Sequence, residues 1–321
     1  MEEGEEDLEK DQDKQIQTLQ IVITCFSFLS ILCSLAILIT FIRDTQRKKN
    51  TNSSLLYLFA LSTLLLSICM TISGLGSELL QENEKFCSCQ GFLLIFSQNC
   101  AIWTLFSLSS SHAAIIWNRG ELSSFMILFF SFALSLTFSL PALLAQKIQF
   151  ETLWCTISNQ EPLFVFLSLD GSLLLVCGSV FVVTTLNVVI LLSSLRNERR
   201  SLIRSSITAP PSPRNSSRKN EIDYHAILNT PNSQISNYYG IKRNLFFNRL
   251  GFHALFLSVF LVIIGARFDI FWKGYTFTTW VLLTIPLSLL GFFLFLFILI
   301  FEGRTFFSRN IENNPPSLFV Q

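Results

Sequence analysis

Charged residues are scarce in this sequence, and their scarcity decides the class of protein. Asp, Glu, Lys and Arg make up 14% of the 321 residues, whereas a soluble domain carries about 25%. Apolar residues account for 50%, phenylalanine alone for 33 positions, and the mean hydropathy is +0.50. The charges are also confined to a few segments that separate long uncharged runs. We therefore expect an integral membrane protein.

Sequence features of enzymes and metal centres are missing as well. The three histidines, His112, His225 and His253, are scattered along the chain. No His/Cys/Asp cluster has the spacing of metal ligands, and no glycine-rich loop is present to hold a phosphate. We expect no enzymatic activity, no cofactor, no metal and no nucleic-acid partner. The two halves also lack the internal repeat that is typical of transporters with inverted symmetry.

Apolar windows of helical length predict an all-α membrane protein with a seven-transmembrane helix bundle over residues 19–301. An acidic segment, 1–18, precedes the bundle, and a short tail, 302–321, follows it. The seven predicted spans are Leu19–Ile42, Ser53–Gly74, Phe86–Trp117, Leu122–Leu144, Leu163–Leu195, Asn244–Ala266 and Thr276–Phe301.

The third predicted span, Phe86–Trp117, is unusually polar for a membrane helix. It contains Gln90, Gln98, Asn99 and His112, together with a run of serines, but no formal charge. A helix with this many polar side chains is not expected to face lipid on all sides, because hydrocarbon offers them no hydrogen bonds. We expect this span to be the central helix of the bundle.

The distribution of Lys and Arg predicts an outer N-terminus and an inner C-terminus. With that orientation the inner segments hold 17 basic residues and the outer segments 6. The short first connection, RDTQRKKN, is the clearest indication.

The inner connection 196–243 is the only long polar segment. Its first part, RNERRSLIRSSI, is expected to extend the fifth span as a basic amphipathic helix, and the rest, rich in Pro, Ser and Asn, to be disordered. Its candidate phosphorylation sites, Ser205, Ser206, Ser212 and Thr230, follow basic residues or precede proline. The alternative is a solvated linker in which no site is used.

Three cysteines fall in the predicted outer segments: Cys87, Cys89 and Cys155. Because the outer face is oxidising, one pair is expected to form a disulfide. A bond from Cys155 to the head of the third span would hold the second outer loop over the bundle mouth. Either Cys87 or Cys89 then remains free or pairs elsewhere.

This arrangement resembles a G-protein-coupled receptor: seven spans, an outer N-terminus, and cysteines at the head of span three and in the second outer loop. The pattern Cys87-Ser-Cys-Gln90-Gly91-Phe92, followed by Trp103, is similar to that of the cyclic-AMP-receptor-like family of slime-mould type. Trp154-Cys155 and Gly291-Phe292 match further positions of that family. The resemblance implies that Cys87, rather than Cys89, bonds to Cys155.

The resemblance also implies a plasma-membrane, multi-pass receptor that binds an extracellular ligand and signals to a heterotrimeric G protein. The candidate ligand-binding residues, in the outer half of the bundle, are Gln90, Gln98, Asn99, Asp170, Arg267, Asp269, Lys273 and Trp280. The candidate G-protein-facing residues are Arg119, Arg199, Arg200, Arg204, Lys242 and Arg243. The two signatures of rhodopsin-type receptors, Asp/Glu-Arg-Tyr and Asn-Pro-x-x-Tyr, are absent.

Each group of candidates has a structural alternative. Gln98 and Asn99 would equally serve to join neighbouring helices. Arg267, Asp269 and Lys273 are expected in a loop, where charges are commonly solvated, and the inner arginines would also bind anionic lipid. Asp170 is the strongest candidate, because an acid within the hydrocarbon needs a partner or a wet cavity. It favours a cationic ligand, whereas Arg267 and Lys273 favour an anionic one. The alternative function is a seven-span transporter or another membrane protein that does not couple to G proteins.

Overall fold

The computed structural model describes residues 2–43, 51–116, 123–151, 153–157, 161–208, 250–270 and 276–302. The first part of the chain forms α1 (Glu2–Arg43), α2 (Thr51–Leu75), α3 (Ser77–Glu82), α4 (Glu84–Ile116) and α5 (Ser124–Leu144). A hairpin of β1 (Ile148–Glu151) and β2 (Trp154–Ile157) follows. The second part comprises α6 (Pro162–Val165), the π-helical turn η2 (Phe166–Asp170), α7 (Gly171–Thr208) and the helix Leu250–Ile270. The last elements are α10 (Phe277–Ser288), α11 (Leu290–Phe297) and the π-helical turn η3 (Ile298–Glu302).

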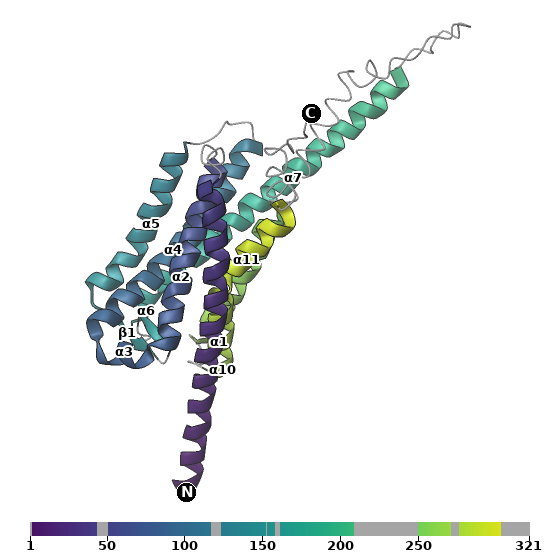
Figure 1. Cartoon of the computed structure of the whole chain (residues 1–321). Helices are drawn as coiled ribbons and strands as arrows, with labels where there is room; N and C mark the ends of the chain where they lie inside the picture. The colour runs from purple at the N-terminus through teal and green to yellow at the C-terminus, as the bar shows by residue number, and fades with distance from the viewer. Residues whose placement is uncertain are drawn as a thin grey trace, which may run out of the picture.

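The helices form a membrane bundle of the predicted kind (Figure 1). Six helices in the described part of the chain are long and apolar enough to cross a membrane, and the pair α10–α11, bent by 46°, supplies a seventh span. Two helices project well beyond the bundle: α1 at the end where the hairpin lies, and α7 at the opposite end. At 1.5 Å per residue, the 42 residues of α1 span about 63 Å, roughly twice the hydrocarbon thickness.

One sequence boundary agrees with the structure and another needs correction. Helix α7 continues to Thr208, so RNERRSLIRSSI extends the fifth span as a helix, as expected, and the first part of the connection 196–243 is not disordered. The segment lacks Gly and Pro, and Pro210 and Pro211 come only after it. The sixth span was expected to end at Ala266 but continues to Ile270, which places Arg267 and Asp269 in a helix rather than a loop. Residues 209–249 lie outside the described part.

Helix α4 is the central helix, as its polar sequence predicts. In α4, 78% of the membrane-spanning window is buried, compared with 22% in α5 and 28% in the span that includes α7. Its polar side chains bond to several neighbours: Gln90 to α2, Ser107 to Ser131 of α5 at 2.6 Å, and Ser109 to His253 of the sixth span at 3.1 Å. Polarity along this helix therefore supplies its contacts with the rest of the bundle.

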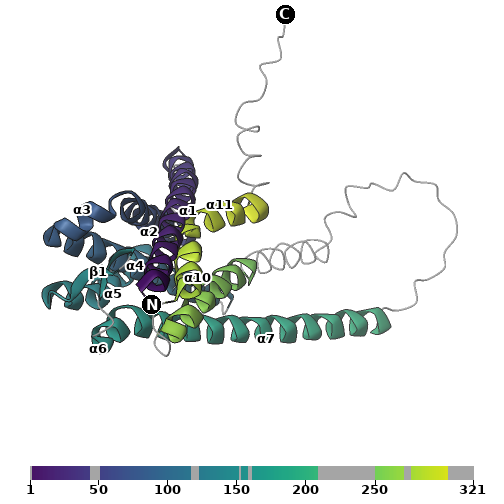
Figure 2. The ribbon, with the colours of Figure 1, turned by 90° about the horizontal axis from the view of Figure 1, so that it is seen from below.

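Helix α1 lies beside both α2 and α11 (Figure 2), and small residues form polar contacts between these helices. Ser34 bonds to Thr63 at 3.2 Å, and Ser67 donates to the Oγ of Ser30 at 2.8 Å. The Oγ of Ser30 also accepts the backbone N–H of Gly291 at 3.0 Å. Gly291 lies just after the break between α10 and α11, in the first turn of α11. Ser30 therefore caps α11 from a different helix, satisfying an N–H that the break leaves without an intrahelical partner.

The packing around Gly291 predicts that Gly291→Ala will destabilise the bundle. A Cβ at this position would lie 2.5 Å from Ser30 Oγ and 2.9 Å from the Ser30 carbonyl oxygen, so α1 and α11 must move apart. We expect a loss of about 1–3 kcal/mol in unfolding free energy, typical of overpacking. Thermal melting in detergent, followed by tryptophan fluorescence, measures it. Gly265→Ala is the matched control, because no atom lies within 4 Å of its added Cβ; equal melting of the two variants would contradict the prediction.

Candidate functional site

The β1–β2 hairpin lies against one end of the bundle. Its strands are antiparallel, with Ile148 opposite Ile157 and Phe150 opposite Cys155. All four residues of β2 are buried, although the strand belongs to a connection between helices. The ion pair between Lys147 and Glu161, at 2.6 Å, joins the segments that precede and follow the hairpin. The hairpin is thus a packed part of the bundle end.

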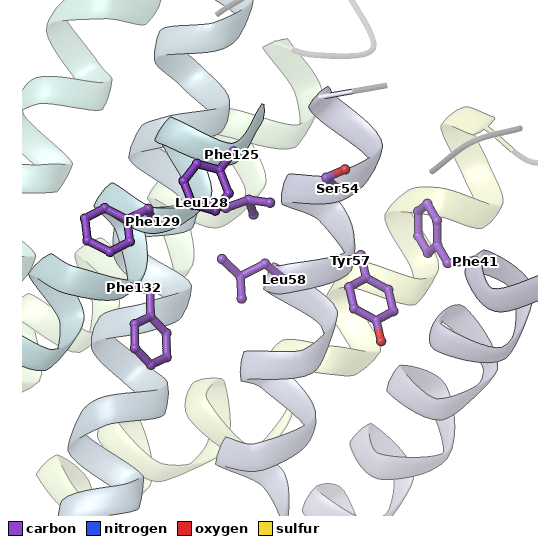
Figure 3. Close-up of a pocket in the computed structure, with 8 residues that line it drawn as sticks. All are labelled: Phe41, Ser54, Tyr57, Leu58, Phe125, Leu128, Phe129 and Phe132. Carbon is purple, nitrogen blue, oxygen red and sulfur yellow. The ribbon is translucent and has the colours of Figure 1, made fainter. Parts of the chain in front are cut away.

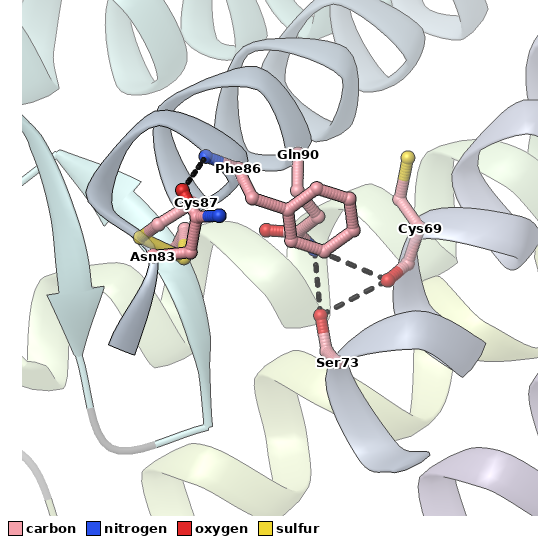
Figure 4. Close-up of a disulfide and its surroundings, with 7 residues drawn as sticks. Cys69, Ser73, Asn83, Phe86, Cys87 and Gln90 are labelled. Atoms are coloured by element: carbon pink, nitrogen blue, oxygen red, sulfur yellow. Dashed lines mark hydrogen bonds between the residues drawn. A yellow bond between two sulfur atoms is a disulfide. The ribbon is translucent and has the colours of Figure 1, made fainter. Parts of the chain in front are cut away.

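A disulfide between Cys87 and Cys155 fastens this hairpin to α4 (Figure 4). The side chain of Asn83 caps α4 by accepting the N–H of Phe86 at 3.1 Å, which fixes the helix start next to Cys87. Of the two candidates at the head of α4, Cys87 forms the bond, as the family resemblance implies, and Cys89 is free and exposed.

Gly91 is required by the same contact. A Cβ on Gly91 would lie 2.5 Å from the Ile148 side chain and 2.8 Å from the Cys155 carbonyl oxygen, so only glycine lets the hairpin reach α4. Gln90 points toward α2 instead, where it donates to the Cys69 carbonyl at 3.1 Å and to Ser73 at 2.7 Å. The Cys87–Gln90–Gly91 motif therefore joins α4 to two different neighbours.

Trp154 extends the hairpin toward the seventh span. Its ring packs edge-to-face on Trp280 of α10, with ring centroids 5.0 Å apart, and both side chains are buried. The pair joins the hairpin, held on α4 by its disulfide, to the opposite wall of the bundle. Trp280 was predicted to face a ligand; it lies beneath the hairpin, at the mouth of the bundle.

Asp170 and Arg267 form an ion pair between the fifth and sixth spans at this end. The Arg267 Nε lies 3.9 Å from the Asp170 Oδ1, and the side chains are 9% and 27% exposed. At this distance the contact is electrostatic, and neither atom has a hydrogen-bond partner in the described structure. Arg267 was expected to be a solvated loop charge; it is buried because a helix carries it to Asp170. The acid and the base, which separately favour ligands of opposite charge, neutralise each other.

Asn99 connects three elements near this pair. Its Nδ2 donates to Ser139 of α5 at 3.0 Å and to the Ser168 carbonyl of η2 at 2.8 Å. Its Oδ1 accepts from Ser172 of α7 at 2.6 Å. The π-helical turn η2 contains both Ser168 and Asp170, so Asn99 supports the turn that carries the acid. Asn99 thus has the helix-joining role that the sequence left open.

Gln98, unlike the adjacent Asn99, has a side-chain oxygen without a hydrogen bond among the described residues. It is buried in α4. The sequence did not indicate the serines that bond to Asn99, nor the contact between Ser109 and His253, because partners on other helices leave no local pattern.

Most of the remaining candidate residues lie at the end of the bundle opposite the hairpin or outside the described residues. Asp269 lies in the last turn of the sixth span, and the last three turns of α7 contain Arg199, Arg200, Arg204, Ser205 and Ser206. The residues outside the described ranges are Arg119, Ser212, Thr230, Lys242, Arg243 and Lys273. Among the described residues no group of three His, Cys, Asp or Glu side chains is placed to hold a metal ion.

Comparison with known proteins identifies a fold. No protein-family model matches the sequence, and no curated protein matches it either. The structure is similar to that of squid rhodopsin, a G-protein-coupled receptor, with a TM-score of 0.67 over 96% of this chain and 89% of that chain. The two sequences are 12% identical. The chain therefore has the fold of a G-protein-coupled receptor.

The disulfide is expected to contribute substantially to stability. Residues 87 and 155 are separated by 68 positions, for which the chain-entropy treatment gives about 3–5 kcal/mol. Replacing both cysteines by serine should lower the unfolding free energy by an amount of this order. Non-reducing peptide mapping with alkylated thiols should yield a Cys87–Cys155 peptide from the unmodified protein. Cys89→Ser is the control and should melt normally; a linked peptide that contains Cys89 would contradict the assignment.

Asn99→Ala should also destabilise the protein, by about 1–3 kcal/mol, because it removes the shared partner of two serines and a carbonyl. Chemical unfolding in detergent micelles provides the measurement. Thr137→Ala is the matched control, since Thr137 is exposed on α5 and its hydrogen bond among the described residues is to the Ala133 carbonyl of its own helix. A loss no larger than that of the control would show that Asn99 does not join the helices.

Proposed function

We propose that the protein is a plasma-membrane receptor that binds an extracellular ligand at the hairpin end and signals to a heterotrimeric G protein at the other. Its N-terminus is outside and its C-terminus inside, consistent with the 17 basic residues of the inner segments against 6 outside. The rhodopsin-like fold supports this function. The motif around Cys87, Gln90 and Gly91 further favours the cyclic-AMP-receptor-like branch of these receptors.

The observation that carries the proposal is the Asp170–Arg267 pair. It joins the fifth and sixth spans at the mouth, where the long Nε–Oδ1 distance leaves both atoms without hydrogen bonds. A ligand with a charged group replaces one partner and gains the hydrogen bonds that the pair does not make. Buried Gln98, with its free Oε1, is a further polar contact for such a ligand.

Signalling then follows as a population shift. The resting state is favoured by the ion pair at one end and by the Ser109–His253 contact at the other. A ligand that binds better to the state with the pair broken increases the population of that state. In that state the inner ends of the fifth and sixth spans separate, and the G protein binds between them, near Arg199, Arg200 and Arg204. Phosphorylation of Ser205, Ser206, Ser212 or Thr230 would add negative charge to this basic surface and weaken coupling.

This mechanism predicts that Asp170→Asn and Arg267→Gln will raise basal signalling. Loss of the pair should favour the active state by about 1 kcal/mol, equivalent to a roughly fivefold increase in the active population. GTPγS exchange is measured with the receptor in nanodiscs and a panel of purified heterotrimeric G proteins. Because both variants remove the same interaction, the double variant should not exceed either single variant by much.

Lys147→Gln is the matched control, since it breaks an ion pair of the outer surface that does not join spans five and six. It should leave basal exchange unchanged. Exchange equal to the receptor-free background in all variants, with folding verified by melting, would reject G-protein coupling. Saturable solute uptake by vesicles that contain the protein would favour a transporter instead.

A further inference from the structure

Three buried polar atoms on the third, fifth and sixth spans lack hydrogen bonds in the described structure. They are Gln98 Oε1, Asp170 Oδ1 and Arg267 Nε, an acceptor, a second acceptor and a donor. The groove on α1, α2 and α5, about 670 Å³ in volume, differs in character (Figure 3). None of its lining residues is charged, so it offers no ion pair to a polar signal from outside. The three unpaired atoms therefore indicate the chemistry of the ligand.

Helix geometry places Gln98 opposite Arg267. Ser109 of α4 and His253 of the sixth span are in contact at 3.1 Å, and the two helices run in opposite directions. Gln98 precedes Ser109 by about three helical turns, and Arg267 follows His253 by about four. Whole numbers of turns keep a residue on the same side of its helix, so both residues lie on the facing sides. Their depths in the bundle differ by about one turn.

Asp170 lies at a similar depth on the fifth span. Asn99, the residue after the glutamine, donates to the Ser168 carbonyl at 2.8 Å and accepts from the Ser172 hydroxyl at 2.6 Å. These two serines flank Asp170 on both sides along the chain. The Asp170 side chain is 27% exposed and the Arg267 side chain 9% exposed. An acid that solvent reaches, a buried base and a buried amide oxygen thus lie close to one level of the bundle.

The charge balance of this site restricts the ligand. The ion pair is neutral, and separating its partners without compensation is strongly unfavourable for buried charges. A ligand with a single charge compensates one partner and leaves the other unpaired. A ligand with an ammonium and a carboxylate compensates both: the ammonium donates to Asp170 and Gln98 Oε1, while the carboxylate accepts from the Arg267 guanidinium.

We propose that the ligand is a zwitterion of the α-amino-acid class, with its ammonium at Asp170 and its carboxylate at Arg267. This inference rests on the proposed function, because it names the ligand class of the site at the ion pair. The two charged groups of an α-amino acid share one carbon, so they enter a 3.9 Å pair with less separation of the spans than a longer zwitterion needs. The acid and the base, which separately favour ligands of opposite charge, are then both used.

The test measures binding without a G protein. The full chain in detergent is mixed with each of the twenty L-amino acids, and size-exclusion chromatography after heating gives the melting temperature. We expect at least one amino acid to raise it by about 5 °C at a concentration a hundred times its dissociation constant. Its N-acetyl derivative, which lacks the ammonium, and its amide, which lacks the carboxylate, should each bind at least tenfold more weakly. Equal affinity of the three forms, or stabilisation by none of the twenty, would overturn the inference.

Charge variants test which residue holds which group. Asp170→Asn leaves the base, so the N-acetyl derivative should gain at least tenfold in affinity relative to the free amino acid. Arg267→Gln leaves the acid and should favour the amide in the same way. Lys147→Gln, which removes a charge from the outer ion pair, should leave the three affinities unchanged. An unchanged order of the three forms in both charge variants would contradict the assignment.

The ligand class and the coupling fail in different ways. Binding of an amino acid, with GTPγS exchange at the receptor-free background, would retain the ligand class and reject G-protein coupling. Raised basal exchange in Asp170→Asn, with binding of the anionic or the cationic derivatives alone to the unmodified protein, would retain the receptor function and overturn the zwitterion.

Discussion

Every other feature of this bundle depends on one constraint: polar side chains buried in a membrane must find partners on other helices. Helix α4 contains more of them than a lipid-facing helix can tolerate, and it is the most buried span. Asn99 shows the consequence, because its three hydrogen bonds position α5, η2 and α7 around it. Apolar contacts alone would leave the rotation of α4 undetermined, since lipid is as apolar as a neighbouring leucine.

The hairpin end of the bundle is organised by covalent and steric contacts in addition to hydrogen bonds. The disulfide fixes Cys155 over α4, Gly91 lets the strand come close, and Trp154 reaches the seventh span at Trp280. These features reinforce each other: a side chain at position 91 would displace the strand that the disulfide holds. The hairpin is therefore held on α4 and reaches the seventh span at the same end of the bundle.

Properties that depend on local composition and on the hydropathy pattern could be predicted from the sequence. Properties that depend on contacts between residues far apart in the chain could not. The number of spans and the central place of α4 follow from hydropathy and polarity. The disulfide required a family resemblance, because spacing alone did not distinguish Cys87 from Cys89. Arg267 was placed in a loop because charge normally ends a membrane helix; no local signal shows that Asp170, nearly a hundred residues earlier, neutralises it. The Ser30–Gly291 cap likewise becomes visible only when α1 and α11 lie together.

The contacts differ between parts of the bundle, and the proposed mechanism depends on that difference. Helices α1, α2, α4 and α11 are connected by serine and glutamine hydrogen bonds, and by glycines whose neighbours leave no space for a Cβ. The polar contacts of the sixth span include the 3.9 Å ion pair between Arg267 and Asp170 and the bond between His253 and Ser109. Adding a Cβ at Gly265 of that span meets no atom within 4 Å. Movement of α11, in contrast, requires repacking of α1 around Gly291. Asp170 contacts the sixth span directly, and the π-helical turn that contains Asp170 is bonded to Asn99. The acid thus lies between the hydrogen-bonded contacts of α4 and the span that the proposed mechanism requires to move.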